Sequence, residues 1–224
     1  MTFSIAAHCP DTGMFGVAVS SSSPAVAARC AFVRPRTGAV LSQNVTDPRL
    51  GTRLLDLLGG GASAEEAIAT VARTAEYVAY RQLIAVDKLG GAAVYSGSHA
   101  LGIVGEARGS GVASAGNLLA EESVPQVIVD AFSASSGHLA ARLLTAMQAA
   151  VEAGGEAGPI HSAGLSIAGE VDWPIVDLRI DWTENCPVAE LSKLWQLYEP
   201  QLDAYITRAL DPSAAPGFAV PGDQ

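Results

Sequence analysis

Residues 2–21, "TFSIAAHCPDTGMFGVAVSS", decide the fold of this chain. Phe3–His8 alternates and is rich in β-forming residues, Pro10–Gly13 ("PDTG") is typical of a turn, and Met14–Ser21 continues as a second strand. The second strand is apolar at consecutive positions, which predicts that both of its faces are covered. The chain therefore opens on a core hairpin whose first strand begins at its second or third residue.

The rest of the chain reads as blocks of strands and helices. Asp47 and Pro48 are typical of a helix start, and Ser63–Glu66 ("SAEE") of a capping box. A third strand is expected over 30–33 and 38–43, with a break at Pro35, followed by helices at 48–58 and 63–74. Strands are then expected at 80–87, 92–97, 103–106 and 111–114, helices at 120–133 and 138–152, and strands at 162–168 and 174–181. A final helix is expected from Pro187 toward Leu210, with a break at Pro200.

The strands come in hairpins and do not alternate singly with helices. This order favours an α+β fold, a four-layer αββα sandwich of two mainly antiparallel sheets with helices on both outer faces. We expect a single domain over residues 1–210. Residues 211–224, rich in Pro, Gly and Ala, are expected to be a flexible tail.

Composition narrows the class of protein. Of 224 residues 49% are hydrophobic and 16% charged, which suits a large core, and the net charge of −10 disfavours nucleic acid and anionic membranes as partners. The sequence has no signal-peptide pattern and no apolar run of membrane-spanning length, so we expect a cytoplasmic protein. The Ala- and Gly-rich composition is compatible with a homo-oligomer.

Cofactor motifs are missing from the sequence. Three cysteines without a C-x-x-C pair suit a reducing compartment, and four dispersed histidines give little support to a metal site. No phosphate-binding glycine motif is present, and no G-x-S-x-G. We therefore expect no cofactor and no metal, and a small-molecule substrate as partner.

Thr2 is the first candidate catalytic residue. Once Met1 is removed, a threonine offers a hydroxyl nucleophile and, on the same residue, an α-amine of pKa about 7.7–8.0 that can accept the hydroxyl proton. A strand that starts here would hold both groups rigidly. The alternative is structural, since threonine simply suits a strand and tolerates methionine removal.

Arg34, Asn117 and Glu122 are weaker catalytic candidates. Arg34 lies between Val33 and Pro35, so it is either a buried cation facing a substrate or a surface residue of an edge strand. The Asn117 amide could donate to an oxyanion or cap the following helix. Glu122 lies in the expected first turn of that helix, where the helix dipole alone favours an acid.

Four further residues are candidates for substrate binding. Tyr80, Arg81 and Gln82 form a polar cluster before an apolar strand, and are either a ligand-facing rim or the exposed start of that strand. Ser21 belongs to the serine run at 20–23, whose hydroxyls either bind a polar ligand or lie in a solvated turn.

Seven short motifs together resemble a known family. They are "TFSIAA", "GVAVSS", "R-x-x-x-GAV-x-SQ" from Arg34, "DPRLGTRLLDLL-x-x-G", "EYVAYRQLIAVD", "AGNLL-x-x-E", and "DLRID" followed by "PVAEL". In this order, from Thr2 to about Leu197, they are similar to the bacterial family called domain of unknown function 1028 (DUF1028), in the N-terminal-nucleophile (Ntn) hydrolase superfamily. Ser22 and "GPIHS" (Gly158–Ser162) depart from the family pattern, which commonly has basic residues there.

The resemblance implies the αββα Ntn fold with Thr2 as its nucleophile. The matching family positions would be Ser21, Arg34, Tyr80, Arg81, Gln82, Asp87, Asn117, Glu122 and Asp177, of which Asp87 and Asp177 could be structural. The leading hypothesis is an amidohydrolase that cleaves a C–N bond in a small amide or cyclic amide, with Asn117 at the oxyanion and Arg34 and Arg81 orienting the substrate. The alternatives are a protein that binds a small metabolite without turnover, and a hydrolase in which Glu122 activates water.

Overall fold

The hairpin at the chain start forms as the sequence predicts. In the computed structural model, which describes residues 1–218, β1 (Thr2–His8) pairs antiparallel with β2 (Phe15–Ser21). The turn between them closes with the Cys9 N–H donating to the Met14 carbonyl at 2.9 Å. Gly13 takes φ +68° in this turn, a left-handed conformation that glycine adopts at little cost.

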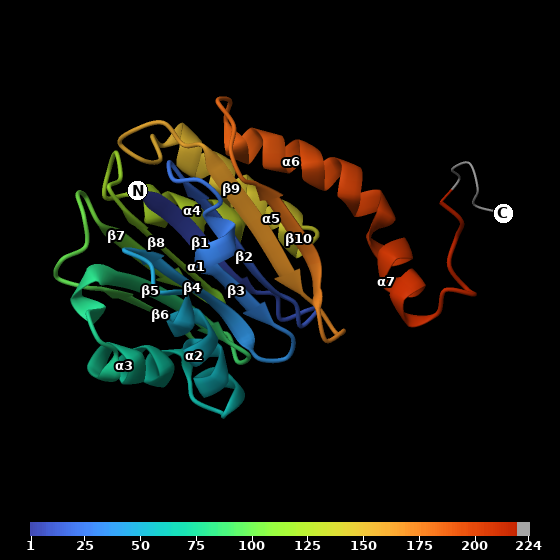
Figure 1. Cartoon of the computed structure of the whole chain (residues 1–224), viewed down its shortest axis with the longest axis horizontal. Helices are drawn as coiled ribbons and strands as arrows, with labels where there is room; N and C mark the ends of the chain where they lie inside the picture. The colour runs from blue at the N-terminus through green and yellow to red at the C-terminus, as the bar shows by residue number, and fades with distance from the viewer. Residues whose placement is uncertain (219–224) are drawn as a thin grey trace.

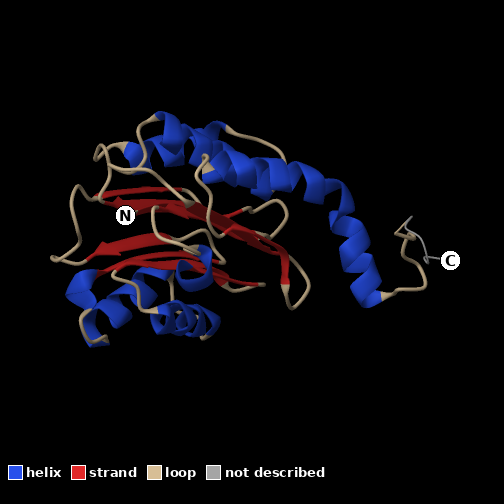
Figure 2. Cartoon of the chain, turned by 45° about the horizontal axis from the view of Figure 1, so that its top comes forward, coloured by secondary structure: helices blue, strands red, loops and turns tan. Residues whose placement is uncertain are grey.

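Two antiparallel sheets are stacked face to face (Figure 2). Sheet A has the strand order β10-β9-β2-β1-β8-β7, so the hairpin lies at its centre, and sheet B has the order β3-β4-β5-β6. The remaining strands are β3 (Ala31–Arg34), β4 (Gly38–Asn44), β5 (Arg81–Asp87), β6 (Ala92–Ser96), β7 (Gly105–Gly109), β8 (Val112–Asn117), β9 (Ser162–Ala168) and β10 (Pro174–Ile180).

Helices cover the outer face of each sheet, which gives the four-layer αββα sandwich expected from the sequence. Sheet B is covered by α2 (Pro48–Gly59) and α3 (Ala64–Thr74), and sheet A by α4 (Val124–Ala134), α5 (Leu139–Glu152) and α6 (Pro187–Tyr198) (Figures 1 and 2). Beside these stand a short α1 (Ala27–Cys30) and α7 (Leu202–Leu210), which follows α6 after a turn of 3₁₀ helix at Glu199–Gln201. None of the helices in residues 1–218 is both long and apolar enough to cross a membrane.

The predicted helix starts are confirmed where the caps are strong. The Asp47 side chain accepts from the Arg49 N–H, with Pro48 at the first position of α2. Ser63 and Glu66 form the complete capping box of α3. The predicted break in the last helix is found at Glu199–Gln201, which includes Pro200.

Two element predictions are wrong. The segment expected as one broken strand is two, β3 and β4, which pair as a hairpin around Pro35–Thr37, with Arg36 at φ +56°. The helix expected from residue 120 begins at Val124, because the chain first crosses to another loop after β8. The predicted domain, residues 1–210, and flexible tail, 211–224, stay predictions, and residues 219–224 lie outside the described part.

The layer between the sheets changes character along its length. Over most of that length it is apolar, filled by side chains such as Phe15, Val19, Leu41 and Ile84. At the end where β1 begins, polar side chains replace them while staying buried. This polar cluster between the sheets consists of Thr2, Ser4, Ser21, Gln43, Gln82 and Asn117.

Candidate active site

The side chains of the polar cluster point into the space between the sheets because of their positions along the strands. Side chains of a strand alternate between its two faces. Ala6 packs into the inter-sheet core, so Thr2 and Ser4, an even number of positions away on β1, share its face. Thr2 lies directly opposite Asn117 in the β1–β8 register, which puts the Asn117 side chain on that face as well.

The Thr2 hydroxyl lies against the end of β2. Thr2 is 5% exposed, and its Oγ1 is 3.4 Å from Ser21 Oγ. Both hydroxyls donate to the carbonyl oxygen of Met1, Ser21 at 2.5 Å. Ser21 Oγ is itself held by Ser23, which donates its N–H at 3.1 Å. The Met1 carbonyl is therefore in direct contact with the two buried hydroxyls.

The ladder between β1 and β8 also orients the Thr2 nitrogen. His8 donates its N–H to the Gly111 carbonyl at 2.8 Å, at the other end of the same ladder. Hydrogen-bonded pairs recur at every second residue of an antiparallel ladder. Thr2 and Asn117 therefore form such a pair, with the Thr2 nitrogen directed at β8. An α-amine at Thr2 would therefore have a defined position beside Asn117.

A chain of side-chain amides links the sheets and fixes how Asn117 is turned. Ser4 donates to Gln43 Oε1 at 2.6 Å, Gln43 Nε2 to Gln82 Oε1 at 2.7 Å, and Asn117 Nδ2 to Gln82 Oε1 at 3.1 Å. Gln43 Nε2 also donates to the Ala115 carbonyl, and Gln82 Nε2 to the Gly116 carbonyl and to Ser96 Oγ. Because backbone carbonyls can only accept, these contacts settle the orientation of both amides.

The Asn117 amide is consequently left with an unpaired acceptor. One of its N–H groups is used by Gln82, and Oδ1 is buried without a hydrogen-bond partner among the described residues. An orphaned acceptor of this kind destabilises the protein until a donor reaches it, by about 1–3 kcal/mol. A donor from an α-amine at Thr2 or from a ligand would satisfy Asn117 Oδ1.

Glu156 enters the site from a loop that crosses over the chain start. Gly154 and Gly155, with φ of +101° and +57°, end α5 and turn the chain back. Leu118 takes φ +51° directly after β8, which lets residues 118–120 pair with 155–157 through bonds such as Ala120 N–H to the Gly155 carbonyl at 3.0 Å. This pairing places Glu156 next to the end of β2.

The Glu156 carboxyl is buried and only half satisfied. The residue is 4% exposed, Oε2 accepts from the Ser22 N–H at 3.2 Å, and Oε1 has no partner among the described residues. Burial raises the pKa of this carboxyl to about 7, against the opposing effects of the Met1 ammonium charge and the Ser22 N–H. A second unpaired acceptor, which is also titratable, thus lies at the chain start.

Arg34 is not part of this cluster. It pairs with Gly38 at the end of β3, and its guanidinium binds Asp56 on α2 at 2.9 Å. Gln43 lies five residues farther along β4, roughly 16 Å at about 3.3 Å per residue. A direct role for Arg34 beside Thr2 is not supported by this position.

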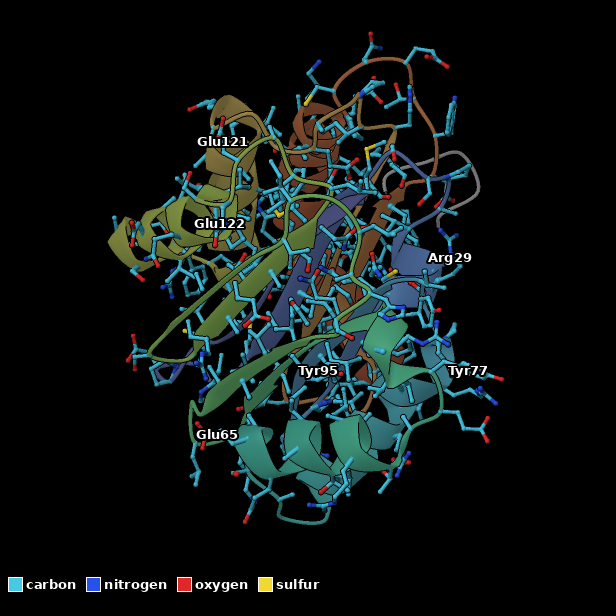
Figure 3. The ribbon with its side chains drawn as sticks, turned by 90° about the vertical axis from the view of Figure 1, so that its left-hand side faces the viewer. Arg29, Glu65, Tyr77, Tyr95, Glu121 and Glu122 are labelled. Atoms are coloured by element: carbon cyan, nitrogen blue, oxygen red, sulfur yellow. The ribbon has the colours of Figure 1, made fainter. Side chains whose placement is uncertain are left out.

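The other predicted residues lie around the cluster. Gln82 and Ser21 belong to it, whereas Arg81, one residue from Gln82, faces the opposite side of β5, where Nη1 donates to the Val45 carbonyl. Tyr80 is 41% exposed and meets the His99 ring edge-on at 4.7 Å. Glu122 is exposed on the loop before α4 (Figure 3), and Asn117 ends a strand and caps no helix.

Sequence reasoning missed Ser4, Gln43 and Glu156. Ser4 and Gln43 carried a usable signal, since each is polar at a position where strand parity points into the core. Glu156 carried little signal in the sequence, because "GGEAGP" (Gly154–Pro159) is typical of the end of a helix. Its place depends on the pairing of two loops distant in sequence.

Comparison with known proteins gives one strong family match. The family model described as "Family of unknown function (DUF1028)" matches residues 2–191. The crystal structure of protein SPO2555 from Silicibacter pomeroyi, also assigned to DUF1028, is 33% identical, with a TM-score of 0.82 over 88% of each chain. No curated protein matches the chain.

Two more distant solved structures overlap with the fold in part. The crystal structure of eukaryotic HslV from Trypanosoma brucei is 11% identical, with a TM-score of 0.45 over 75% of this chain and 99% of that one. Anbu, an ancestral beta-subunit from Yersinia bercovieri, is 14% identical, with a TM-score of 0.41 over 91% and 97%. Likenesses of this strength carry no information about the site.

Proposed function

The chain belongs to the family of unknown function DUF1028, and from the geometry of its site we propose that it is an Ntn-type hydrolase. Thr2, once Met1 has been removed, attacks the carbonyl carbon of a small amide or cyclic amide and cleaves its C–N bond. The observation that carries the proposal is the burial of Thr2, a residue 5% exposed at the start of the central hairpin, with the Ser21 hydroxyl 3.4 Å from its own. A threonine needed only for strand pairing would not require this neighbour.

In the first step the Thr2 hydroxyl oxygen forms a bond to the carbonyl carbon. Its proton passes to the α-amine of the same residue, which is unprotonated in part at neutral pH. The tetrahedral intermediate collapses, the C–N bond breaks, and the proton held by the amine goes to the leaving nitrogen. The product of this step is an ester between the acyl group and Thr2.

Water completes the cycle. The Thr2 amine takes a proton from water as the water oxygen attacks the ester carbon. The C–O bond to Thr2 then breaks, the threonine oxygen recovers a proton, and the acyl group leaves as a carboxylic acid. No redox partner is consumed in either step.

We assign the oxyanion to the hydroxyl of Ser21 in place of the amide of Asn117. Ser21 Oγ already donates to a carbonyl oxygen, that of Met1, at 2.5 Å. The Asn117 amide gives one N–H to Gln82, and its Oδ1 accepts no hydrogen bond among the described residues. That acceptor suits the N–H groups of the Thr2 amine, which would make Asn117 a positioning residue.

The test begins with the intact mass of the isolated protein, followed by reaction with an electrophilic β-lactone probe and peptide mapping. We expect a mass lower by one methionine and probe attached to Thr2. Thr2→Ser keeps a hydroxyl and an amine and should still be labelled. Thr2→Ala should react at least about a thousandfold more slowly, because the nucleophile is gone.

The matched control is Thr145→Ala, which removes an exposed threonine hydroxyl on α5. This variant should be labelled like the wild type. Retention of Met1 in the mature protein would contradict the mechanism and favour binding without turnover. Labelling that persists in Thr2→Ala would contradict it too, since another nucleophile must then react.

A further inference from the structure

Met1 occupies the space that a substrate must enter. Its carbonyl oxygen accepts from Thr2 Oγ1 and Ser21 Oγ, the two hydroxyls to which the reaction has been assigned. Its side chain lies over the 155–158 loop, where a Cβ added at Gly158 would meet the Met1 Cε and Sδ at 3.4 and 3.6 Å. Met1 therefore shows which protein groups surround an acyl group that is bound next to the Thr2 hydroxyl.

The amino end of Met1 lies at the level of Glu156. In the β1–β2 register Phe3 faces Ser20, so continuing the pairing by two residues sets Met1 opposite Ser22. Ser22 donates its N–H to Glu156 Oε2, and the charge of the Met1 ammonium acts on the Glu156 carboxyl. Glu156 thus lies at the level of Met1, one residue beyond Thr2 in the continued pairing.

We infer that Glu156 recognises a protonated amine on the acyl part of the substrate, so that the preferred substrates are amides of amino acids. The inference rests on the proposed function, because it takes the acyl group to be bound at Thr2. Glu156 is 4% exposed, and its Oε1 has no donor among the described residues. An ammonium group supplies both the missing hydrogen bond and the charge that a buried carboxylate requires.

The position of the Met1 side chain beside Gly158 favours an unbranched apolar side chain on such a substrate.

The two ligands that test this are L-methioninamide and 4-(methylthio)butanamide, which lacks only the amino group. Binding is measured by calorimetry to the Thr2→Ala variant, which cannot turn the ligand over. We expect methioninamide to bind at least about tenfold more tightly, the value of a hydrogen bond to a charged group.

A second experiment replaces the Glu156 carboxyl with an amide. Glu156→Gln in the Thr2→Ala background should bind both amides with equal affinity, while Glu152→Gln, an exposed acid at the end of α5, should keep the preference. Among the described residues the Glu156 carboxyl has no ion pair to lose, so the amide variant should fold, and circular dichroism checks this.

Three results would overturn the inference. Equal binding of the two amides by Thr2→Ala would do so, as would absence of binding by either. An equal loss of affinity for both amides in Glu156→Gln would show that Glu156 supports the site generally and does not read the amine. Each of these leaves the proposed function standing, provided that the β-lactone still labels Thr2 in the wild type.

Discussion

At the scale of single residues, the Glu156 carboxyl makes stability depend on pH. Its pKa is about 7 in the folded chain because of burial, against an ordinary value of 4.5. At pH below 4.5 the carboxyl is protonated in both the folded and the unfolded state and does not change the free energy of unfolding. Between pH 4.5 and 7 it ionises only in the unfolded state, so the free energy of unfolding falls as pH rises. Above pH 7 it is ionised in both states, and the decrease has reached its full value, up to about 3 kcal/mol.

Glu156→Gln removes this titration. We expect the variant to gain stability relative to the wild type as pH rises from 4.5 to 7, by up to about 3 kcal/mol, and to gain no more above 7. Urea denaturation at pH 4.5, 6 and 8 measures the difference. Any constant offset from the fit of the new amide cancels between pH values.

Glu152→Gln provides the comparison for this titration. It makes the same charge change at an exposed position four residues earlier. Its stability difference from the wild type should stay flat over the same pH range. A flat profile for Glu156→Gln as well would mean that its carboxyl ionises as readily in the folded chain as in the unfolded one.

At the scale of elements, α2 is fitted closely to β3 through one glycine. A Cβ added at Gly51 would clash with the ring of Phe32, which lies on β3. Gly51→Ala should therefore destabilise the protein by about 1–3 kcal/mol, even though alanine favours a helix. Thermal or urea denaturation measures the loss.

Gly59, at the other end of the same helix, supplies the matched substitution. A Cβ there would meet its nearest neighbours, in Arg34 and Thr37, at 3.6 and 3.7 Å, which is ordinary contact. Gly59→Ala should leave stability unchanged or raise it by up to about 1 kcal/mol. If the two alanine variants behaved alike, the close fit of α2 to β3 would not contribute to stability.

Elements with strong local signals were predictable, and those shaped by distant contacts were not. The caps at Asp47 and Ser63 are formed by neighbours in sequence, so their helices begin where predicted. The start of α4 was misplaced because residues 118–120 pair with 155–157, a contact that no local pattern reveals. The left-handed Leu118 that permits this pairing is equally hidden in the sequence.

At the scale of the whole molecule, the site follows from how the two sheets face each other. Thr2 and Asn117 could be chosen from the sequence as candidates, but not as neighbours, since the order of strands in sheet A brings them together. Gln82 belongs to sheet B and reaches Asn117 across the space between the sheets. Arg34, equally plausible from the sequence, lies on the same sheet as Gln82 but at its other end.

Helix α7 and the residues after it extend beyond the sandwich, so the C-terminal boundary of the domain can be tested by truncation (Figure 1). A chain that ends at Leu210 loses contacts such as that of Arg208 with the Pro216 carbonyl, which are exposed. Exposed contacts are worth about 0–1 kcal/mol, so we expect the melting temperature to change by less than about 4 °C and Thr2 to be labelled as before.

A chain that ends at Cys186 should not fold stably, because it lacks α6. That helix buries Val188, Leu191 and Trp195 against sheet A and α5, and each large apolar side chain contributes about 1.5–3 kcal/mol. Their sum approaches the total stability of an ordinary domain. Trp195→Ala in the full-length chain separates packing from chain length: a loss of about 3–5 kcal/mol in urea denaturation is expected. A stable chain without α6 would instead confine the domain to the residues before it.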